Sequence, residues 1–362
     1  MSIAVVILNW NGKKLMEEFL PFLKASIQDM PNVEIVIADN GSTDNSLHFL
    51  KEKYPEIRTI LFEENHGFAG GYNRALKQIE SDYYVLLNSD VEVTKDWLKI
   101  LSDYMEQNPE VAACQPKIRS YYNRTFFEYA GASGGFIDKH GYPFCRGRIF
   151  GVVEEDNGQY DDIRDIFWAT GACLMIRSKD YWDAGALDEE FFAHQEEIDL
   201  CWRLKSRGRR IVCNPHSVVY HVGGGTLKVE NPRKTYLNFR NNLLILYKNL
   251  PHKNLMKTFN IRFYLDNLAA VHFAMQGKFQ NVKAVIDART DFRTIQDRFE
   301  TKRKENILKS VQSIFKEMAQ SSLLYEFYIK RRRKFSEMPW NEYEIIDENV
   351  KDTETTGNKK DE

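Results

Sequence analysis

Apolar segments and helix-like segments alternate regularly over the first part of the chain. Strand-like segments lie at 3–8, 34–39, 57–62 and 83–88. The first of them, "IAVVIL", is apolar throughout, as expected of a parallel strand that is covered on both faces. The intervening segments have helical patterns, at 13–26, 42–54 and 68–80. Successive strand–helix units of this kind predict an α/β fold with a doubly wound, mainly parallel sheet.

The pattern is less regular in the middle of the chain and becomes helical towards its end. Helices are expected at 95–108, 178–184 and 196–207, and strands at 111–118, 165–177 and 210–221, the last broken by Pro215. Segment 119–165 has little periodicity and is predicted to form hairpins and a long loop. Helical patterns return at 232–250, 254–276, 280–299 and 303–333.

These patterns predict three parts of the chain. An α/β domain is expected over 1–230, with a flexible glycine elbow at 223–225 near its end, and a helical region over 231–335. The tail at 336–362 is predicted to be largely disordered, because its last part has no apolar residues to bury.

Polar side chains stand at the ends of four of the predicted strands. These residues are Asn9, Asp39, Asn65 and Asp90. The carboxyl ends of parallel strands meet at one edge of the sheet, and ligands of open α/β folds bind there. The sequence therefore predicts a binding site at this edge.

The buried strand in "YYVLLNSDVEV" (83–93) is followed by two carboxylates, Asp90 and Glu92. Residues two apart in a strand face the same side, where two carboxylates repel each other unless a cation, a positive group or water separates them. Oxygen ligands of this kind suit Mg²⁺ or Mn²⁺, and His221 at another strand end could be a third ligand. The alternatives are solvated carboxylates and a structural histidine.

Two further segments at this edge have both a binding and a structural interpretation. In "ENHGFAGGYNRA" (64–75), glycines lead into a helix whose N-terminus favours anions, although Gly67 could equally belong to a capping turn. The G-x-G-x-x-G fingerprint is absent from the first strand–helix turn. Asp39 could hold a ribose hydroxyl or a base N–H, or it could close an Asx-turn over "DNGS".

Three acids, Glu196, Glu197 and Asp199, crowd the start of a predicted helix in "FFAHQEEIDLCWRLKSRG" (191–208). Negative charge stabilises a helix N-terminus, and Arg203 stands at ion-pair spacing from Asp199, so a structural role is open. The functional alternative is a general base, which needs an acid whose pKa is raised by partial burial.

Composition narrows the classes of function. The 362 residues include 50 Lys and Arg and 52 Asp and Glu, a formal net charge of -2, which argues against a nucleic-acid partner. Five cysteines without a C-x-x-C pair fit neither a disulfide framework nor a zinc ribbon, and they suit a reducing cytosol. The N-terminus lacks the basic start of a signal peptide. The sequence has no run of about 18 apolar residues, so no spanning helix is expected.

Seven segments, taken in order, resemble the family-2 glycosyltransferases with the GT-A fold, especially their non-processive, rhamnosyltransferase-like branch. They are "VVILNWNG", "IVIADNGSTDNS", "ENHGFAGGYNRAL", "YYVLLNSDVEV", "WATGACLMIR", "FFAHQEEIDLCWRLKSRG" and "YHVGGGT", within roughly 3–226. The resemblance implies a GT-A nucleotide-diphospho-sugar transferase fold with a C-terminal helical extension. The Q-x-x-R-W signature of processive polymerases is missing, as are their membrane spans, which implies transfer of one sugar per encounter.

The resemblance also implies roles for the matching residues. The nucleotide-sugar site would comprise Asn9, Asp39, Asn65, Gly71, Asn73, Ser89 and Asp90. A divalent metal, Mn²⁺ or Mg²⁺, would be held by Asp90, Glu92 and His221.

The resemblance also implies which residues are catalytic and which lie on the acceptor side. The family's Glu-Asp pair corresponds to Glu196-Glu197, so Glu197 takes the place of the base, with Glu196 and Asp199 as alternatives. Trp168 and Gly171 would lie on the acceptor side, where Trp168 could stack on a sugar or simply belong to the core.

The implied reaction is an inverting transfer of one sugar, rhamnose or a similar hexose, from a UDP- or dTDP-sugar. The acceptor would be a hydroxyl of a glycan or lipid-linked molecule in bacterial cell-surface polysaccharide synthesis. One alternative is a sugar nucleotidyltransferase, which needs a glycine-rich basic loop after the first strand, where "NWNGKK" is a poor version. Another is a catalytically inactive carbohydrate-assembly partner.

The helical region mixes apolar stripes with Lys and Arg and includes "KRRRK" at 330–334. Such helices suit peripheral contact with the inner face of the plasma membrane, or an ordinary bundle packed on the α/β domain. We expect a cytoplasmic protein.

Overall fold

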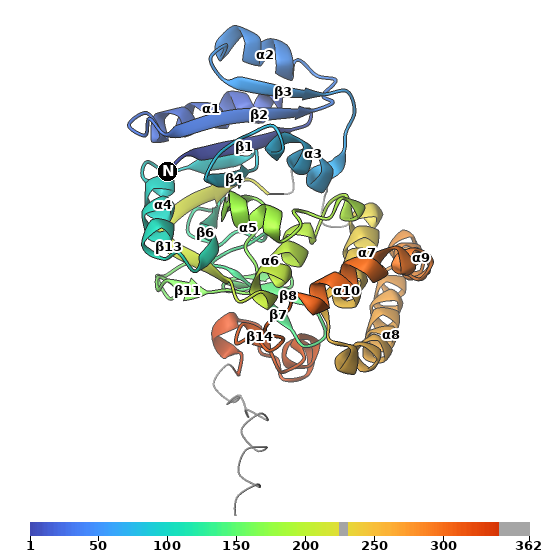
Figure 1. Ribbon diagram of the computed structural model, residues 1–362. Coiled ribbons are helices and arrows are strands. Elements are labelled where there is room, and N and C mark those ends of the chain that lie inside the picture. Colours follow the sequence, from blue (N-terminus) through green and yellow to red (C-terminus); the bar gives the residue numbers. More distant parts are fainter. Residues whose placement is uncertain (224–230, 340–362) are drawn as a thin grey trace, which may run out of the picture.

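The computed structural model describes residues 1–223 and 231–339 and confirms the α/β architecture (Figure 1). The strands of its large sheet are β1 Ile3–Asn9, β2 Val33–Asn40, β3 Arg58–Phe62, β4 Tyr83–Leu87, β5 Val91–Val93, β6 Val111–Ser120, β11 Arg164–Asp165, β12 Cys173–Arg177 and β13 Arg210–His221. They are ordered β11-β13-β6-β12-β4-β1-β2-β3, with β5 paired to β13. The run from β4 to β3 is parallel, whereas β12 is antiparallel to both of its neighbours.

Helices cover both faces of this sheet. One face carries α1 Lys13–Ser26, α2 Ser46–Lys53 and α4 Trp97–Gln107, and the other carries α3 Gly67–Leu76, α5 Ser178–Asp183 and α6 Glu196–Ser206. In β1, Val5 and Ile7 belong to the first of these two cores, and Ala4 and Val6 belong to the second. Alternate residues of one strand therefore fill two cores, which is why the strand is apolar at every position.

The hairpins predicted for 119–165 are present and form a second, five-stranded sheet with the order β10-β9-β8-β7-β14. Its strands are β7 Gly135–Asp138, β8 Pro143–Cys145, β9 Arg148–Ile149, β10 Val152–Val153 and β14 Met318–Ala319. β14 lies inside 303–333, for which a helix was expected. That prediction is wrong for 309–322, where Met318–Ala319 pairs with β7, although 323–329 is helical again.

Two predicted strands differ in detail from the observed ones. Only the two ends of 165–177 are strands: Arg164–Asp165 pairs with β13, and Cys173–Arg177 pairs with β4. β13 continues past Pro215, but its register against β6 shifts between Asn214 and Val218, because proline cannot donate to the ladder.

The C-terminal helices are α7 Pro232–Asn249, α8 His252–Met275, α9 Phe279–Ile295 and α10 Glu300–Leu308. Shorter turns are η1 Glu189–Phe191, η2 Gln296–Phe299, η3 Tyr325–Ile329 and η4 Phe335–Glu337. α7 packs against α6 and carries α8 and α9 on its outer side (Figure 1). None of the described helices is long and apolar enough to cross a membrane. The predicted domain boundary at 230, most of the glycine elbow and the tail from 340 lie outside the described residues.

Candidate active site

The ends of β1 and β2 carry Asn9 and Asp39, which face each other in register. Asn9 Nδ2 donates to Asp39 Oδ2 at 2.8 Å, and the backbone N–H of Ser42 donates to Asp39 Oδ1 at 2.9 Å. Both side chains are buried, and Asn9 Oδ1 has no hydrogen-bond partner among the described residues. The structure thus joins these two predicted residues and fixes Asp39 within a side chain–backbone turn.

Ser89, in the segment after β4, lies beside Gly12, as Asn9 does. A Cβ at Gly12 would lie 2.4 Å from Asn9 Oδ1 and 3.4 Å from Ser89 Oγ. The shorter distance is a clash, so position 12 requires glycine, and two predicted nucleotide-sugar residues converge beside it.

The turn after β3 is held by Asn40, a residue that the sequence did not single out. Asn40 Nδ2 donates to Asn65 Oδ1 at 3.1 Å and to the carbonyl of Gly67 at 3.0 Å. The N–H of Gly67 donates to the same Asn65 oxygen at 2.8 Å, and the φ of Gly67 is +72°. Asn65 therefore shapes the glycine turn, and the amide at the end of β2 fixes it in place.

Gly71 and Asn73 lie inside α3, where the structure shows packing roles for both. A Cβ at Gly71 would lie 2.7 Å from Leu8 Cδ1, so glycine lets α3 approach β1. Asn73 accepts from the Tyr181 hydroxyl at 2.6 Å and donates to the Leu187 carbonyl at 2.8 Å. Its amide therefore ties α3 to the segment that precedes η1, and its role at the nucleotide sugar stays a prediction.

Asp90 lies against His221, as a shared site requires. His221 Nε2 is 3.1 Å from Asp90 Oδ1, and His221 Nδ1 is 3.2 Å from Glu128 Oε2. Burial lowers the pKa of His221, but its contacts with Asp90 and Glu128 outweigh burial and raise the pKa to about 10. Burial likewise opposes ionisation of Asp90, but His221 outweighs it and holds the pKa of Asp90 below its usual value. Glu128 is a further residue that the sequence did not indicate.

Glu92 takes a different partner from Asp90. Both of its carboxylate oxygens accept hydrogen bonds from Arg124, at 3.0 and 2.7 Å. The Arg124 guanidinium also stacks on Tyr220, with 4.3 Å from its Cζ to the ring centroid. The two adjacent carboxylates are therefore separated by positive groups, His221 on one and Arg124 on the other.

Two of the three predicted metal ligands fit a divalent cation. The 3.1 Å between Asp90 Oδ1 and His221 Nε2 is close to the spacing of about 3 Å expected for neighbouring ligands of an octahedral ion with bonds of about 2.1 Å. Glu128 stands behind the imidazole as carboxylates commonly do behind metal-bound histidines. Glu92 is occupied by Arg124, and the described residues contain no group of three His, Cys, Asp or Glu side chains arranged to hold a metal.

Glu196 and Glu197 open α6. The Oε2 atoms of both lack a hydrogen-bond partner among the described residues. Burial raises the pKa of Glu197 to about 7, although backbone N–H groups at the helix start partly oppose the shift. Burial and the nearby charge of Glu197 raise the pKa of Glu196 further. Acids with a raised pKa are suited to take up a proton near neutral pH.

Both carboxylate oxygens of Asp199 accept hydrogen bonds from the protein. Its Oδ2 accepts from Arg203 at 3.0 Å and Lys248 at 2.7 Å, and its Oδ1 accepts from Asn249 at 2.9 Å. Burial would raise the pKa of Asp199, but the two cations outweigh it and hold the pKa below the usual value. Lys248 also binds Asp188 at 2.6 Å. The structure therefore supports the ion-pair alternative for Asp199.

A strained loop presents the two glutamates. Phe192, His194 and Gln195 have φ of 63°, 70° and 72°, a conformation that L-residues rarely adopt. Asn241 of α7 holds this loop, since its Nδ2 lies within hydrogen-bond distance of the carbonyls of Phe191, Ala193 and His194 at 3.1, 3.0 and 2.7 Å.

The same loop contacts the glycine turn at the sheet edge. The carbonyl of Phe192 accepts from the N–H of Phe68 at 2.7 Å, and a Cβ at Gly67 would lie 2.6 Å from the Phe192 ring. The loop that precedes the acids of α6 is thus in direct contact with the turn after β3. Sequence reasoning missed Asn241, and its only signal was the "NN" directly before the apolar run "LLIL".

On the acceptor side, Trp168 lies in the core. Its Nε1 donates to the Phe136 carbonyl at 2.9 Å, and only 4% of the residue is exposed, so it offers no free ring face for a sugar. A Cβ at Gly171 would lie 2.8 Å from the Phe68 ring, so Gly171 allows that ring to pack. The acceptor role of Gly171 stays a prediction.

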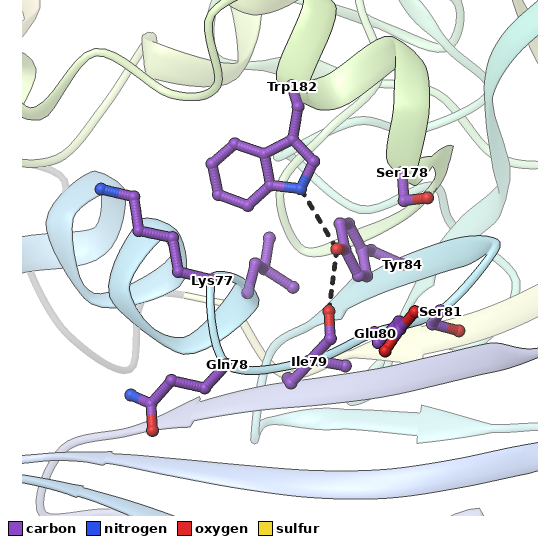
Figure 2. A pocket seen from close by; sticks show the side chains of 9 residues that line it. Lys77, Gln78, Ile79, Glu80, Ser81, Tyr84, Ser178 and Trp182 are labelled. Atoms are coloured by element: carbon purple, nitrogen blue, oxygen red, sulfur yellow. Dashed lines mark hydrogen bonds between the residues drawn. The ribbon is translucent and has the colours of Figure 1, made fainter.

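A surface hollow of about 640 Å³ lies elsewhere, beside the first residues of β4 (Figure 2). Its lining includes Tyr84, whose hydroxyl accepts from Trp182 Nε1 at 3.2 Å and donates to the Ile79 carbonyl at 3.0 Å. Because β4 begins here, the hollow is at the end of the strand opposite to Ser89 and Asp90. It contains none of the predicted site residues.

Comparison with known proteins gives relatives by sequence. The family model "Glycosyl transferase family 2" matches residues 4–183. The N-acetylglucosaminyl-diphospho-decaprenol L-rhamnosyltransferase of Mycobacterium tuberculosis is 26% identical over 234 residues, which are 60% of this chain and 75% of that protein. The low-salt glycan biosynthesis hexosyltransferase Agl10 of Haloferax volcanii is 23% identical over 248 residues, 67% of this chain and 75% of that one.

Solved structures share the fold. S. aureus TarS in complex with UDP-GlcNAc superposes with a TM-score of 0.54 at 17% identity, over 81% of this chain and 80% of that one. GalNAc-T7 with UDP, GalNAc and Mn²⁺ superposes with a TM-score of 0.53 at 15% identity, over 68% of this chain and 48% of that one. The fold is GT-A, and the chain belongs to glycosyl transferase family 2, where it resembles the rhamnosyltransferase-like branch.

Proposed function

We propose that the protein is a metal-dependent, inverting glycosyltransferase that moves one hexose, rhamnose or a similar sugar, from a UDP- or dTDP-sugar to a hydroxyl group. The acceptor would be a glycan or a lipid-linked molecule of bacterial cell-surface polysaccharide synthesis. The observation that carries the proposal is Glu197 in the first turn of α6, directly after the loop that contacts the glycine turn. Its Oε2 has no hydrogen-bond partner among the described residues, and its pKa is raised to about 7.

Donor binding in this proposal uses the edge formed by β1, β2 and β4. Asp39 would accept from an N–H of the nucleotide base, because Asn9 and Ser42 already orient its carboxylate. The diphosphate would lie near Ser89 and the glycine turn. Asp90 and His221, after the imidazolium loses its Nε2 proton, would hold a divalent ion, Mn²⁺ or Mg²⁺. When bound, this ion would neutralise the negative charge that develops on the leaving diphosphate.

Glu197 would act on the acceptor. Its carboxylate would take the proton from the acceptor hydroxyl while that oxygen attacks C1 of the sugar and the C1–O bond to the diphosphate breaks. Attack opposite the leaving group in a single displacement inverts the anomeric centre. We place the enzyme in the cytoplasm, at the inner face of the plasma membrane, and its five cysteines are free thiols, as a reducing compartment allows.

Calorimetric titration with UDP and dTDP, each with and without Mn²⁺, tests this function. We expect binding of at least one nucleotide that tightens when Mn²⁺ is present. A protein that binds neither nucleotide under any condition would not be a glycosyltransferase of this kind.

The rate of transfer should increase with pH through neutrality. A general base acts as the carboxylate, and the pKa of Glu197 is raised to about 7, so the active form is lost as the pH falls below that value. We expect kcat/KM to rise about tenfold per pH unit below about pH 6.5 and to level off above about pH 8. A profile that is flat from about pH 5.5 upwards would contradict Glu197 and favour a base with an ordinary or lowered pKa, such as Asp199.

Asn241→Ala should slow the reaction without weakening donor binding. The substitution removes the single amide that faces three carbonyls of the strained loop, so Glu197 should lose its fixed position. Misplacement of a catalytic group by about 1 Å costs on the order of 10²-fold in rate, and we expect a loss in kcat of about that size. Initial rates and UDP calorimetry measure the two effects. Asn260→Ala makes the same change at an exposed position of α8, and an equal loss there would contradict a specific role for Asn241.

A further inference from the structure

The helix α8 buries a polar pair and exposes several large apolar side chains. The side chains that it buries are Leu255, Thr258, Arg262 and Asp266. Arg262 donates to Asp266 at 3.2 Å and to the His140 carbonyl at 3.1 Å, so a polar network anchors the inner side. Its large exposed apolar side chains are Met256, Phe263, Tyr264, Leu268, Val271 and Met275, with exposed fractions between 44% and 82%.

These apolar residues share one side of α8 with a few polar residues. At about 100° per residue, Met256, Phe263, Leu268, Val271 and Met275 lie within an arc of about 140°, and we call this side the stripe. The exposed polar residues Lys257 and Asn260 lie in the same arc. The 24 residues of α8 make the helix about 36 Å long. Figure 1 shows α8 and α9 at the outer margin of the molecule, away from the large sheet.

The neighbouring helix α9 extends the stripe. Arg289 of α9 lies over the Phe263 ring, with 4.3 Å from its Cζ to the ring centroid, and donates to the Phe263 carbonyl. Ile286, three residues earlier on the same side of α9, is exposed, as is Phe279 at the start of this helix.

The charges around the stripe are basic. The only acid of α8, all of whose residues the structure describes, is Asp266, and it is buried against Arg262. The exposed charged residues of α8 and α9 are Lys253, Lys257, Lys283 and Arg293, and α9 also carries the half-buried acids Asp287 and Asp291 beside Arg289. This face is therefore cationic and apolar, although the whole chain carries a formal net charge of -2.

We propose that α8 and the adjoining side of α9 rest on the surface of an anionic lipid bilayer. In this arrangement the apolar stripe enters the boundary between headgroups and acyl chains, and the lysines lie among the lipid phosphates. A second copy of the chain is a poorer occupant, because a two-fold dimer through this face would place its basic residues against themselves. This docking surface goes beyond the proposed transfer reaction and does not depend on it.

Vesicle sedimentation with the full chain tests the surface. The protein should bind vesicles of phosphatidylglycerol and phosphatidylcholine, bind pure phosphatidylcholine at least tenfold more weakly, and dissociate as salt is raised to about 0.5 M. Leu268→Glu should weaken binding to the anionic vesicles at least tenfold. Replacing Lys253 and Lys257 together by Gln should weaken it about 25-fold, roughly fivefold for each charge.

Leu308→Glu is the matched control, because it makes the same change at an 85% exposed leucine at the end of α10. Its binding should stay within twofold of that of the unchanged chain, and thermal unfolding shows that each variant is folded. Equal binding to both kinds of vesicle, no binding, or no effect of Leu268→Glu would overturn the proposal. So would a dimer in sedimentation velocity that Leu268→Glu dissociates, since the face would then belong to a second copy. Nucleotide titration of the same samples reports on the proposed function separately.

Discussion

Glu197→Gln is expected to lower kcat by about 10³-fold while the affinity for the donor nucleotide changes less than about twofold. The amide has the size of the carboxylate but cannot accept the acceptor's proton near neutral pH. Because the Oε2 atom of Glu197 has no hydrogen-bond partner among the described residues, the substitution breaks no such bond at that atom. Initial rates at saturating substrates and calorimetry with UDP or dTDP measure the two quantities.

Two other substitutions make this result specific. Glu190→Gln changes an exposed glutamate seven residues earlier and should leave kcat within about twofold, which controls for the loss of one charge near the site. Asp199→Asn weakens the buried contacts with Lys248 and Arg203, so it should reduce stability first. A folded Asp199→Asn protein that binds donor but does not react, beside an active Glu197→Gln protein, would assign the base to Asp199.

Much of the fold could be predicted because the large sheet is encoded locally. Each face of a buried parallel strand needs its own apolar residues, so "IAVVIL" is recognisable without knowledge of its neighbours. The polar residues that close β1 and β2 were predicted to meet because the carboxyl ends of parallel strands lie at one edge of the sheet, and Asn9 and Asp39 do. The segment around β14 was misread, because its structure depends on β7, which lies about 180 residues earlier in the chain.

The candidate site was less predictable, because its electrostatics depend on distant partners. Spacing marks Arg203 as an ion-pair partner of Asp199, but it gives no sign of Lys248, which lies about 50 residues later and also binds Asp199. The Oε2 atoms of Glu196 and Glu197 have no partner among the described residues. Asp90 and Glu92 look like a pair, yet Arg124 takes up both oxygens of Glu92. No spacing rule reports such contacts, because they are set by packing between elements.

The contacts of α7 show that the helical region is part of the site. The sequence pattern separates 231–335 from the α/β domain, but Asn241 and Lys248 of α7 hold the loop and the first turn of α6. Lys302 of α10 adds a contact of 2.7 Å to Asp188, which Lys248 also binds. Without these lysines, two buried carboxylates would lack much of their compensation, at a cost of about 3–5 kcal/mol for a broken buried pair. We therefore expect the α/β domain to need α7 to present its acids.

Asp90→Asn should abolish the tightening of nucleotide binding by Mn²⁺ and reduce kcat/KM by about 10²- to 10³-fold. Asparagine keeps an oxygen that can accept from His221, so the fold should survive, but it lacks the charge that attracts a divalent cation. Calorimetry with and without Mn²⁺ measures the first effect.

Glu92→Gln is the variant to compare with Asp90→Asn, because it also replaces a carboxylate by an amide, two residues later. If Arg124 is the only partner of Glu92, the Mn²⁺ effect should persist and the rate should fall by less than about tenfold. Loss of the Mn²⁺ effect in both variants would instead mean that Glu92 leaves Arg124 to bind the ion, as the sequence predicts. Retention of the Mn²⁺ effect in Asp90→Asn would remove Asp90 from the metal site altogether. The two variants thus decide whether the cation is held by the acid beside His221 or by the pair of acids.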